Sequence, residues 1–429
     1  MRLQTRWMLI GLLLAAGRPG YSDEDSAAVE AAIAEIKRVS GSFRVDDTKP
    51  GKPIVDVSLM GRSITNTTLQ HLDELTSLEG LNLGNTQITD AGLQHLKGLT
   101  SLETLLLIGT QITDSGLQHL SGLVNLEYLN LQNTKVSDAG LEHLKGLTNL
   151  RILYLANTQI SDTGLAHVEG LSKLEWIDLQ STKATDAGLE HLKGLTNLER
   201  LGLSSEITDA GLVHLKELHK LKELNLSRTK VTDAGLEHLK GLTNLKRLDL
   251  TGPRITDPGL VHLKDLTGLD TLALTQTKVT DAGFVHLKGL TNLKVLYLWD
   301  GQITDVGLEH LKGLTSLKTL WLRKTQVTDA GLVHLKGMTK LESLDLAVTE
   351  ITDSGLVHLK GLPGLKGLNL AETKVTVTDV GLEQLTGMRR LRFLGLRDTD
   401  VSDESAKALQ RALRNCRIDR GSGFLPPFL

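Results

Sequence analysis

The sequence is poor in several residue types, and each shortage narrows the class of protein. Only one of its 429 residues is a cysteine, Cys416, which excludes an internal disulfide framework. The 48 Lys and Arg residues are balanced by 51 Asp and Glu residues, so we expect no nucleic-acid partner. Aromatic residues make up 3% of the chain and proline contributes 8 residues against 42 glycines, which predicts an aliphatic core and turns made without proline. The 40% hydrophobic and 23% charged fractions are typical of a soluble folded protein.

The N-terminus carries an apolar stretch that is too short to span a bilayer. Arg2 and Arg6 precede the mostly apolar residues from Trp7 to Ala16, and small residues follow as far as Ser22. This order of basic, apolar and small residues predicts a secretory signal peptide over residues 1–22. We therefore expect export to the periplasm, the cell surface or the medium, and no membrane span in the mature chain.

Most of the remaining chain is a repeat. The text LEGLNLGNTQITDAGLQHLKGLTS from Leu78 recurs in closely similar form with a period of 24 residues, and a fixed period of this length predicts a solenoid. We expect about fifteen repeats over residues 54–416, with the last unit, 391–416, as a C-terminal cap. Residues 23–53 are expected to form a helical and extended N-terminal cap, and residues 417–429 a tail. Repeats begin at Ile54, Leu78, Leu102, Leu126, Leu150, Leu174, Leu198, Leu221, Leu245, Leu269, Leu293, Leu317, Leu341, Leu365 and Leu391.

Each repeat can be divided into a strand and a helix. In the segment LxxLxL, positions four and six point to one side of a strand, and positions three, five and seven point to the other. The threonine at position nine, such as Thr86, is expected to bond backbone groups of the adjacent repeat. The following [IV]-[TS]-D-x-G-L predicts a helix start in which Thr or Asp is the N-cap. A single repeat cannot bury its leucines alone, so neighbouring repeats must stack.

The pattern LxxLxLxxTx[IV]TDxGLxHLxxL resembles the leucine-rich repeat family. It is most similar to the subclass with TD-x-GL helices, found in F-box-associated repeats and in exported bacterial proteins. The resemblance implies an α/β solenoid, a curved right-handed arc with a parallel sheet on the concave face and helices on the convex face. It also implies binding of other macromolecules. This sequence departs from the F-box-associated pattern, because Thr stands at position nine where Cys or Asn is usual, and no F-box precedes the repeats.

Motifs of catalysis are not found. The sequence has no GxxxxGK[ST], HExxH or CxxC, so we predict that the protein is not an enzyme and has no cofactor or metal. Thirteen histidines recur at one helix position from His71 to His358. Equivalent positions on packed helices lie roughly 10 Å apart, too far for two imidazoles to share a metal ion, so we interpret these histidines as structural.

The outward strand positions carry the candidate site. Beyond the leader region, every Trp and Tyr falls at position three, five or seven, and exposed aromatic residues on a rigid surface are typical of interaction hot spots. They form two groups, one over repeats four to six and one over repeats eleven and twelve, with charged residues between and beside them. The alternative interpretation is that the aromatic residues stabilise the sheet. The predicted partner-binding residues are Tyr128, Tyr154, Trp176, Arg200, Arg247, Tyr297, Trp299, Trp321 and Arg323.

The sequence thus predicts a non-enzymatic scaffold that binds another protein through its concave face. Three alternatives stay open. Aromatic platforms in an exported protein also suit a glycan, and a purely structural envelope protein would need no ligand. An F-box-like ubiquitin-ligase adaptor would require a cytosolic location.

Overall fold

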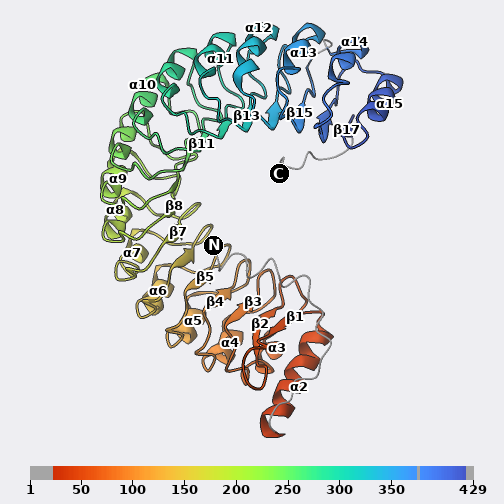
Figure 1. Cartoon of the computed structure of the whole chain (residues 1–429). Helices are drawn as coiled ribbons and strands as arrows, with labels where there is room; N and C mark the ends of the chain where they lie inside the picture. Colours follow the sequence, from red (N-terminus) through yellow and green to blue (C-terminus); the bar gives the residue numbers. More distant parts are fainter. Residues whose placement is uncertain (1–22, 374–376, 422–429) are drawn as a thin grey trace. The chain divides into compact units, whose positions relative to one another are not determined.

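The computed structural model describes residues 23–373 and 377–421, so the predicted signal peptide and the end of the predicted tail lie outside the described residues. The described chain divides into two compact units. Unit 1 consists of residues 23–207 and 213–221, and unit 2 of residues 208–212 and 222–421 without 374–376. Within each unit, the strands lie on the inner side of a curve and the helices on its outer side (Figure 1).

Unit 1 begins with a helix and a short antiparallel pair, followed by parallel strands. Its strands are β1 Ser42–Val45, β2 Ile54–Ser58, β3 Gly80–Asn82, β4 Thr104–Leu106, β5 Tyr128–Asn130, β6 Ile152–Tyr154, β7 Trp176–Asp178 and β8 Arg200–Gly202. Its α-helices are α2 Asp23–Arg38, α3 Asn66–Gln70, α4 Asp90–Leu93, α5 Asp114–Leu117, α6 Asp138–Leu141, α7 Asp162–Leu165 and α8 Asp186–Leu189. Its 3₁₀ helices are η2 Gln94–Leu96, η3 Gln118–Leu120, η4 Glu142–Leu144, η5 Glu190–Leu192 and η6 Val213–Leu215.

Unit 2 repeats the same alternation. Its strands are β9 Glu223–Asn225, β10 Arg247–Asp249, β11 Thr271–Ala273, β12 Val295–Tyr297, β13 Thr319–Trp321, β14 Ser343–Asp345, β15 Gly367–Asn369, β16 Phe393–Gly395 and β17 Arg417–Asp419. Its α-helices are α9 Asp209–Leu212, α10 Asp257–Leu260, α11 Asp305–Leu311, α12 Asp329–Leu332, α13 Asp353–Leu359, α14 Asp379–Leu382 and α15 Asp403–Ala412. Its 3₁₀ helices are η7 Gly235–Leu239, η8 Val261–Leu263, η9 Asp281–Leu287, η10 Val333–Gly337 and η11 Glu383–Leu385.

The strands pair in parallel with matching repeat positions. In unit 1, Leu105 of β4 is aligned with Leu129 of β5, and in unit 2, Leu296 of β12 is aligned with Leu320 of β13. Equivalent residues therefore form rows across the sheet, one residue from each repeat. β17 pairs with β16 and lies in the segment predicted as a tail. The α/β solenoid with its parallel sheet is confirmed within each unit.

The core consists of the leucine and isoleucine positions of the repeat. In the repeat that begins at Leu78, all seven are fully buried: Leu78, Leu81, Leu83, Ile88, Leu93, Leu96 and Leu99. Their spacing is strand-like in the first half and helix-like in the second, so both elements turn their apolar side toward the same interior. Burying a Leu or Ile side chain contributes about 1.5–3 kcal/mol, so the stacked leucine rows are the main stabilising interaction.

The threonine at position nine was predicted to bond the adjacent repeat, and this prediction was wrong. The hydroxyl of Thr86 donates to the carbonyl oxygen of Leu83 at 2.6 Å, and Thr134 donates to Leu131 at 2.6 Å. Both bonds lie within one repeat, because the chain turns back on itself between positions six and nine. The buried hydroxyl thus satisfies a carbonyl of its own turn and does not link neighbouring repeats.

The T-D-x-G motif provides the link between repeats. The carboxylate of Asp138 accepts the backbone N–H of Ser161 at 2.7 Å and the Ser161 hydroxyl at 2.5 Å, although Ser161 belongs to the next repeat. A Cβ built on Gly164 would lie 2.4 Å from Oδ1 of Asp138, so glycine is needed for the close approach. Of the two predicted N-cap candidates, Thr or Ser is the N-cap, as Ser161 is for α7, whereas the Asp lies in the first turn of its own helix and also holds the N-cap residue of the following repeat.

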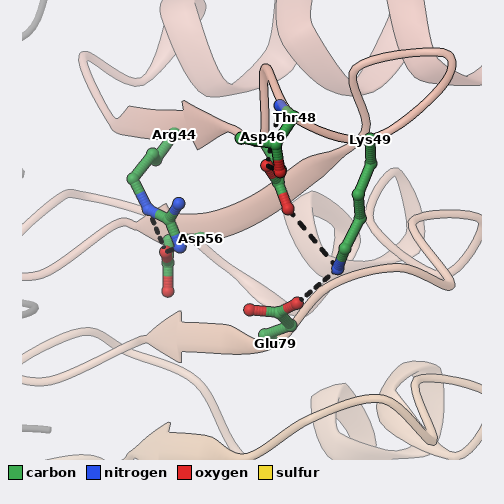
Figure 2. Close-up of polar contacts among 6 residues, drawn as sticks. All are labelled: Arg44, Asp46, Thr48, Lys49, Asp56 and Glu79. Carbon is green, nitrogen blue, oxygen red and sulfur yellow. Dashed lines mark hydrogen bonds and ion pairs between the residues drawn. The ribbon is translucent and has the colours of Figure 1, made fainter. Parts of the chain in front are cut away.

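The N-terminal cap contains a cluster of polar contacts (Figure 2). Arg44 on β1 donates through Nε to Oδ2 of Asp56 on β2 at 2.5 Å, and the Asp56 side chain is completely buried. In the loop between the two strands, Lys49 contacts Glu79 at 2.8 Å and Asp46 at 3.5 Å. β1 runs antiparallel to β2, so it covers the edge that the parallel ladder would otherwise expose.

Candidate functional site

The outward aromatic residues of unit 1 form one continuous row. The rings of Tyr128 and Tyr154 meet edge to face with centroids 5.7 Å apart, and those of Tyr154 and Trp176 lie 4.7 Å apart at 62°. The row ends at Arg200, whose guanidinium carbon lies 4.6 Å from the Trp176 ring centroid. The predicted residue Arg200 thus makes a cation–π contact within the chain.

Burial affects the ionisable groups of this row. It raises the pKa of Tyr128 and Tyr154, and it also raises the pKa of Asp178, which lies beside Trp176 on β7. The three aromatic residues and Arg200 are all half-buried. Each ring edge contacts the next ring, so much of the aromatic surface is already covered by its neighbours. These contacts support the interpretation that the row stabilises the sheet of unit 1.

Unit 2 holds a more open aromatic group. Tyr297 and Trp321 are aligned on β12 and β13, with ring centroids 4.6 Å apart at an interplanar angle of 51°. Trp299, two residues after Tyr297, is 41% exposed, whereas the other five predicted aromatic residues are half-buried. We call Tyr297, Trp299 and Trp321 the unit 2 aromatic patch.

Charged side chains border the unit 2 aromatic patch. Arg323 forms an ion pair with Glu372 at 3.2 Å, and Lys324 forms one with Asp300 at 2.7 Å. Burial raises the pKa of Tyr297, and the positive charge of Arg247 partly opposes this rise. The patch is therefore a group of aromatic rings with a charged border.

The charged residues predicted to lie between the two aromatic groups belong to both units. Arg200 belongs to unit 1 and contacts Trp176. In unit 2, the exposed Arg247 is aligned with Glu223 on β9.

Sequence reasoning missed two contributors to these surfaces. Phe393 is also half-buried at an outward strand position, and a search that included Phe with Trp and Tyr finds it. Glu372 lies two repeats after Arg323, and no pattern within a single repeat indicates their pairing.

Among residues 23–373 and 377–421, no three His, Cys, Asp or Glu side chains are placed to hold a metal ion. Two of the recurrent histidines contact acids of the preceding repeat: His95 lies 3.6 Å from Asp73, and His191 lies 3.6 Å from Glu169. Within the described ranges, no helix has the length and apolar character that crossing a bilayer requires.

Comparison with solved structures gives matches of low sequence identity. A leucine-rich repeat protein of Leptospira interrogans is 20% identical, with 81% of this chain and 91% of that chain covered and a TM-score of 0.58. A TDR receptor is 17% identical, with 85% of this chain and 63% of that chain covered and a TM-score of 0.52. An internalin of Listeria monocytogenes is 22% identical, with 96% and 100% covered and a TM-score of 0.49. At these identities the similarity concerns the fold alone.

Comparison with sequences and family models is more decisive. No curated protein sequence matches the chain significantly. A family model described as leucine-rich repeat region matches residues 107–334, which is more than half of the 429 residues. A second model, described as leucine rich repeat, matches residues 74–97 and 337–359. The chain therefore belongs to the leucine-rich repeat family.

Proposed function

We propose that this protein is a non-enzymatic scaffold that binds another protein through the unit 2 aromatic patch on its concave face. The leucine-rich repeat fold supports a protein-binding scaffold in general. The observation that carries the specific proposal is the 41% exposure of Trp299 beside the Tyr297–Trp321 ring pair. Large aromatic residues that stay exposed on a rigid sheet have little effect on folding and a large one on binding.

The two aromatic groups differ in how much of their surface is engaged within the chain, and this difference favours the unit 2 aromatic patch as the binding site. In unit 1, the row from Tyr128 to Trp176 is closed by Arg200, so its surface is engaged within the chain. In unit 2, Trp299 extends beyond the ring pair, and the nearby Arg323 and Lys324 are held by acids. Unit 2 is therefore the proposed contact, and the unit 1 row a contributor to stability.

The chain itself supplies safe substitutions to test this proposal. Trp321→Leu places at position five the residue that Leu106 provides in another repeat, and Trp299→Ala copies Ala347 at position seven. The control is Tyr128→Thr, which copies Thr104 at position three of the preceding repeat. All variants should keep the far-ultraviolet circular dichroism of the parent.

The assay is affinity capture from envelope and secreted fractions, with retained material identified by mass spectrometry. We expect one protein to be retained by the parent and by the Tyr128→Thr control, and to be lost from the double variant Trp299→Ala/Trp321→Leu. Equal retention by all three chains would remove the unit 2 aromatic patch from the site. Retention of polysaccharide without protein would favour a glycan ligand.

We also propose that the protein is exported. The support is the order of Arg2, Arg6 and the apolar residues from Trp7 to Ala16. N-terminal sequencing of the protein from the envelope or the medium should find a start near residue 23. Recovery from the cytosol with the first 22 residues retained would refute export and would reopen the F-box-like alternative.

A further inference from the structure

A second surface of unit 2 departs from the repeat pattern, on the loops that lead from the helices back to the strands. In four repeats these loops carry Thr-Asn at positions 23 and 24, as at Thr291 and Asn292. The Asn292 side chain donates to the carbonyl oxygen of Thr267 in the preceding repeat at 2.9 Å, and Asn197 donates to Ser172 at 2.9 Å. An asparagine in this place therefore ties one loop to the next.

In unit 2, the five loops from Thr243 to Thr339 all carry Thr at position 23, and the two loops nearest the C-terminus carry neither this Thr nor the Asn. Pro363 and Gly364 replace the pair after α13, and Arg389 and Arg390 replace it after η11. In the second loop, Met388 also stands where most repeats have a leucine, and it is half-buried. A groove of about 550 Å³ lies between these loops. Its lining residues follow α13 and α14 in the chain, and Figure 1 labels these two helices.

The lining of the groove defines the chemistry of its occupant. The side chains of Leu362, Pro363 and Met388 supply an apolar floor, and a flexible thioether adapts well to a side chain that enters. A sulfated sugar has no apolar side chain to fill such a floor. A peptide can carry one, so the floor favours a peptide over a sulfated sugar.

The border of the groove is basic. Lys360, Arg389 and Arg390 line it and are exposed, against a single acid, Glu383. Arginine presents a planar fork that matches a carboxylate with two hydrogen bonds. Two further basic residues, Lys366 and Arg392, stand at position two of the repeats that begin at Leu365 and Leu391. Lys366 is paired with Glu342 at 2.6 Å, so the cations of the groove border are the ones offered to a ligand.

We propose that this groove binds an acidic peptide segment of a partner protein, with an apolar side chain of the segment on the Leu362–Met388 floor and its carboxylates on Lys360, Arg389 and Arg390. The site is separate from the unit 2 aromatic patch and does not depend on it. A partner that engages both surfaces gains affinity from the second contact at no extra cost in translational freedom.

The test uses the full chain and a fluorescent hexapeptide, Glu-Asp-Leu-Phe-Asp-Glu, whose binding is followed by anisotropy. The groove variant Arg389→Thr/Arg390→Asn restores the Thr-Asn pair and gives the loop an asparagine that can reach the Pro363 carbonyl. The matched control is Lys264→Thr/Lys288→Thr, which removes two exposed cations of unit 2 at the position where Thr386 stands in another repeat. Both variants carry residues that the chain already uses in those places.

We expect the groove variant to weaken peptide binding at least tenfold and the control to change it less than twofold. In a chain labelled with ¹³C at the methionine methyl groups, the Met388 signal should move on titration and the signal of the buried Met338 should stay. An equal loss in both variants, a Met388 signal that does not move, or equal binding of a peptide with serine for Leu-Phe overturns the proposal. Binding of a sulfated oligosaccharide in place of the peptide overturns it as well.

Discussion

The contact between Asp138 and Gly164 gives the sharpest test of how neighbouring repeats are joined. Asp138→Ala removes both bonds from Ser161 and leaves its backbone N–H without its acceptor. A hydrogen bond to a charged group contributes about 1.5–3 kcal/mol when buried. The Asp138 carboxylate is only part-buried, so we expect a loss of about 2–3 kcal/mol for the two bonds together.

Gly164→Ala perturbs the same contact from the other side. Its new Cβ would lie 2.4 Å from Oδ1 of Asp138, so the carboxylate must shift and its bonds to Ser161 must stretch. Overpacking of this kind costs about 1–3 kcal/mol. In the double variant the carboxylate is already absent, so most of the steric conflict disappears. The double variant should therefore be about 1–2 kcal/mol more stable than the sum of the single losses predicts.

The assay is urea unfolding followed by circular dichroism, compared at constant slope with denaturant. Repeat arrays can unfold in stages, so hydrogen exchange of the amide of Ser161 provides a local readout. Gly170→Ala is the control, because a Cβ there has nothing within 4 Å, and it should change stability by less than about 0.5 kcal/mol. If the two single losses add to within about 0.5 kcal/mol in the double variant, the steric account of the motif is wrong.

Three further predictions concern the caps and the turns. Arg44→Met leaves the buried carboxylate of Asp56 without its guanidinium and should cost about 2–4 kcal/mol in urea unfolding, whereas an unchanged midpoint would show that the cap is not part of the cooperative unit. The pKa of Glu35 is lowered from 4.5 to about 2, chiefly by its hydrogen bond with Arg38. Its stabilising effect is therefore complete above pH 4.5 and is lost as the pH falls toward 2, so the protection factors of the α2 amides, corrected for intrinsic exchange at each pH, should fall over that window, and Glu35→Gln should remove this fall. Val348 has a φ of 56°, a region in which a β-branched residue is strained, so Val348→Asn should raise the free energy of unfolding by about 1 kcal/mol, and a destabilised variant would argue that the valine side chain makes a compensating contact.

The repeat made the fold predictable because the same pattern of apolar residues occurs in nearly every unit. Each period places leucines at the same strand and helix positions, so the parallel strands and the buried rows follow from a single unit. The errors arose where a polar side chain had two possible hydrogen-bond partners within reach. The hydroxyl at position nine was assigned to the adjacent repeat and bonds Leu83 in its own repeat when the donor is Thr86. The acid of the T-D-x-G motif was one of two N-cap candidates for its own helix, and Asp138 instead bonds the N-cap residue of the next helix, Ser161.

For the aromatic residues, too, the sequence pattern determined some features and left others open. Outward strand positions identify them, and the register confirms that Tyr297 and Trp321 are neighbours. The pattern does not tell a covered ring from an exposed one. In unit 1, the next residue in the row is Arg200, and its guanidinium covers the Trp176 ring. In unit 2, Trp299 lies at the turn after the strand and stays exposed.

By itself, the sequence determined the period, the parallel strands, the leucine core and the membership of the solenoid class, because these depend on the spacing of apolar residues along the chain. Only the tertiary structure decided which polar groups meet. It joined Asp138 to Ser161, paired Arg323 with Glu372 across two repeats and opened the groove beside Met388. Hydrogen bonds and ion pairs act over about 3 Å, so their partners depend on how whole repeats stack and cannot be read from one repeat alone.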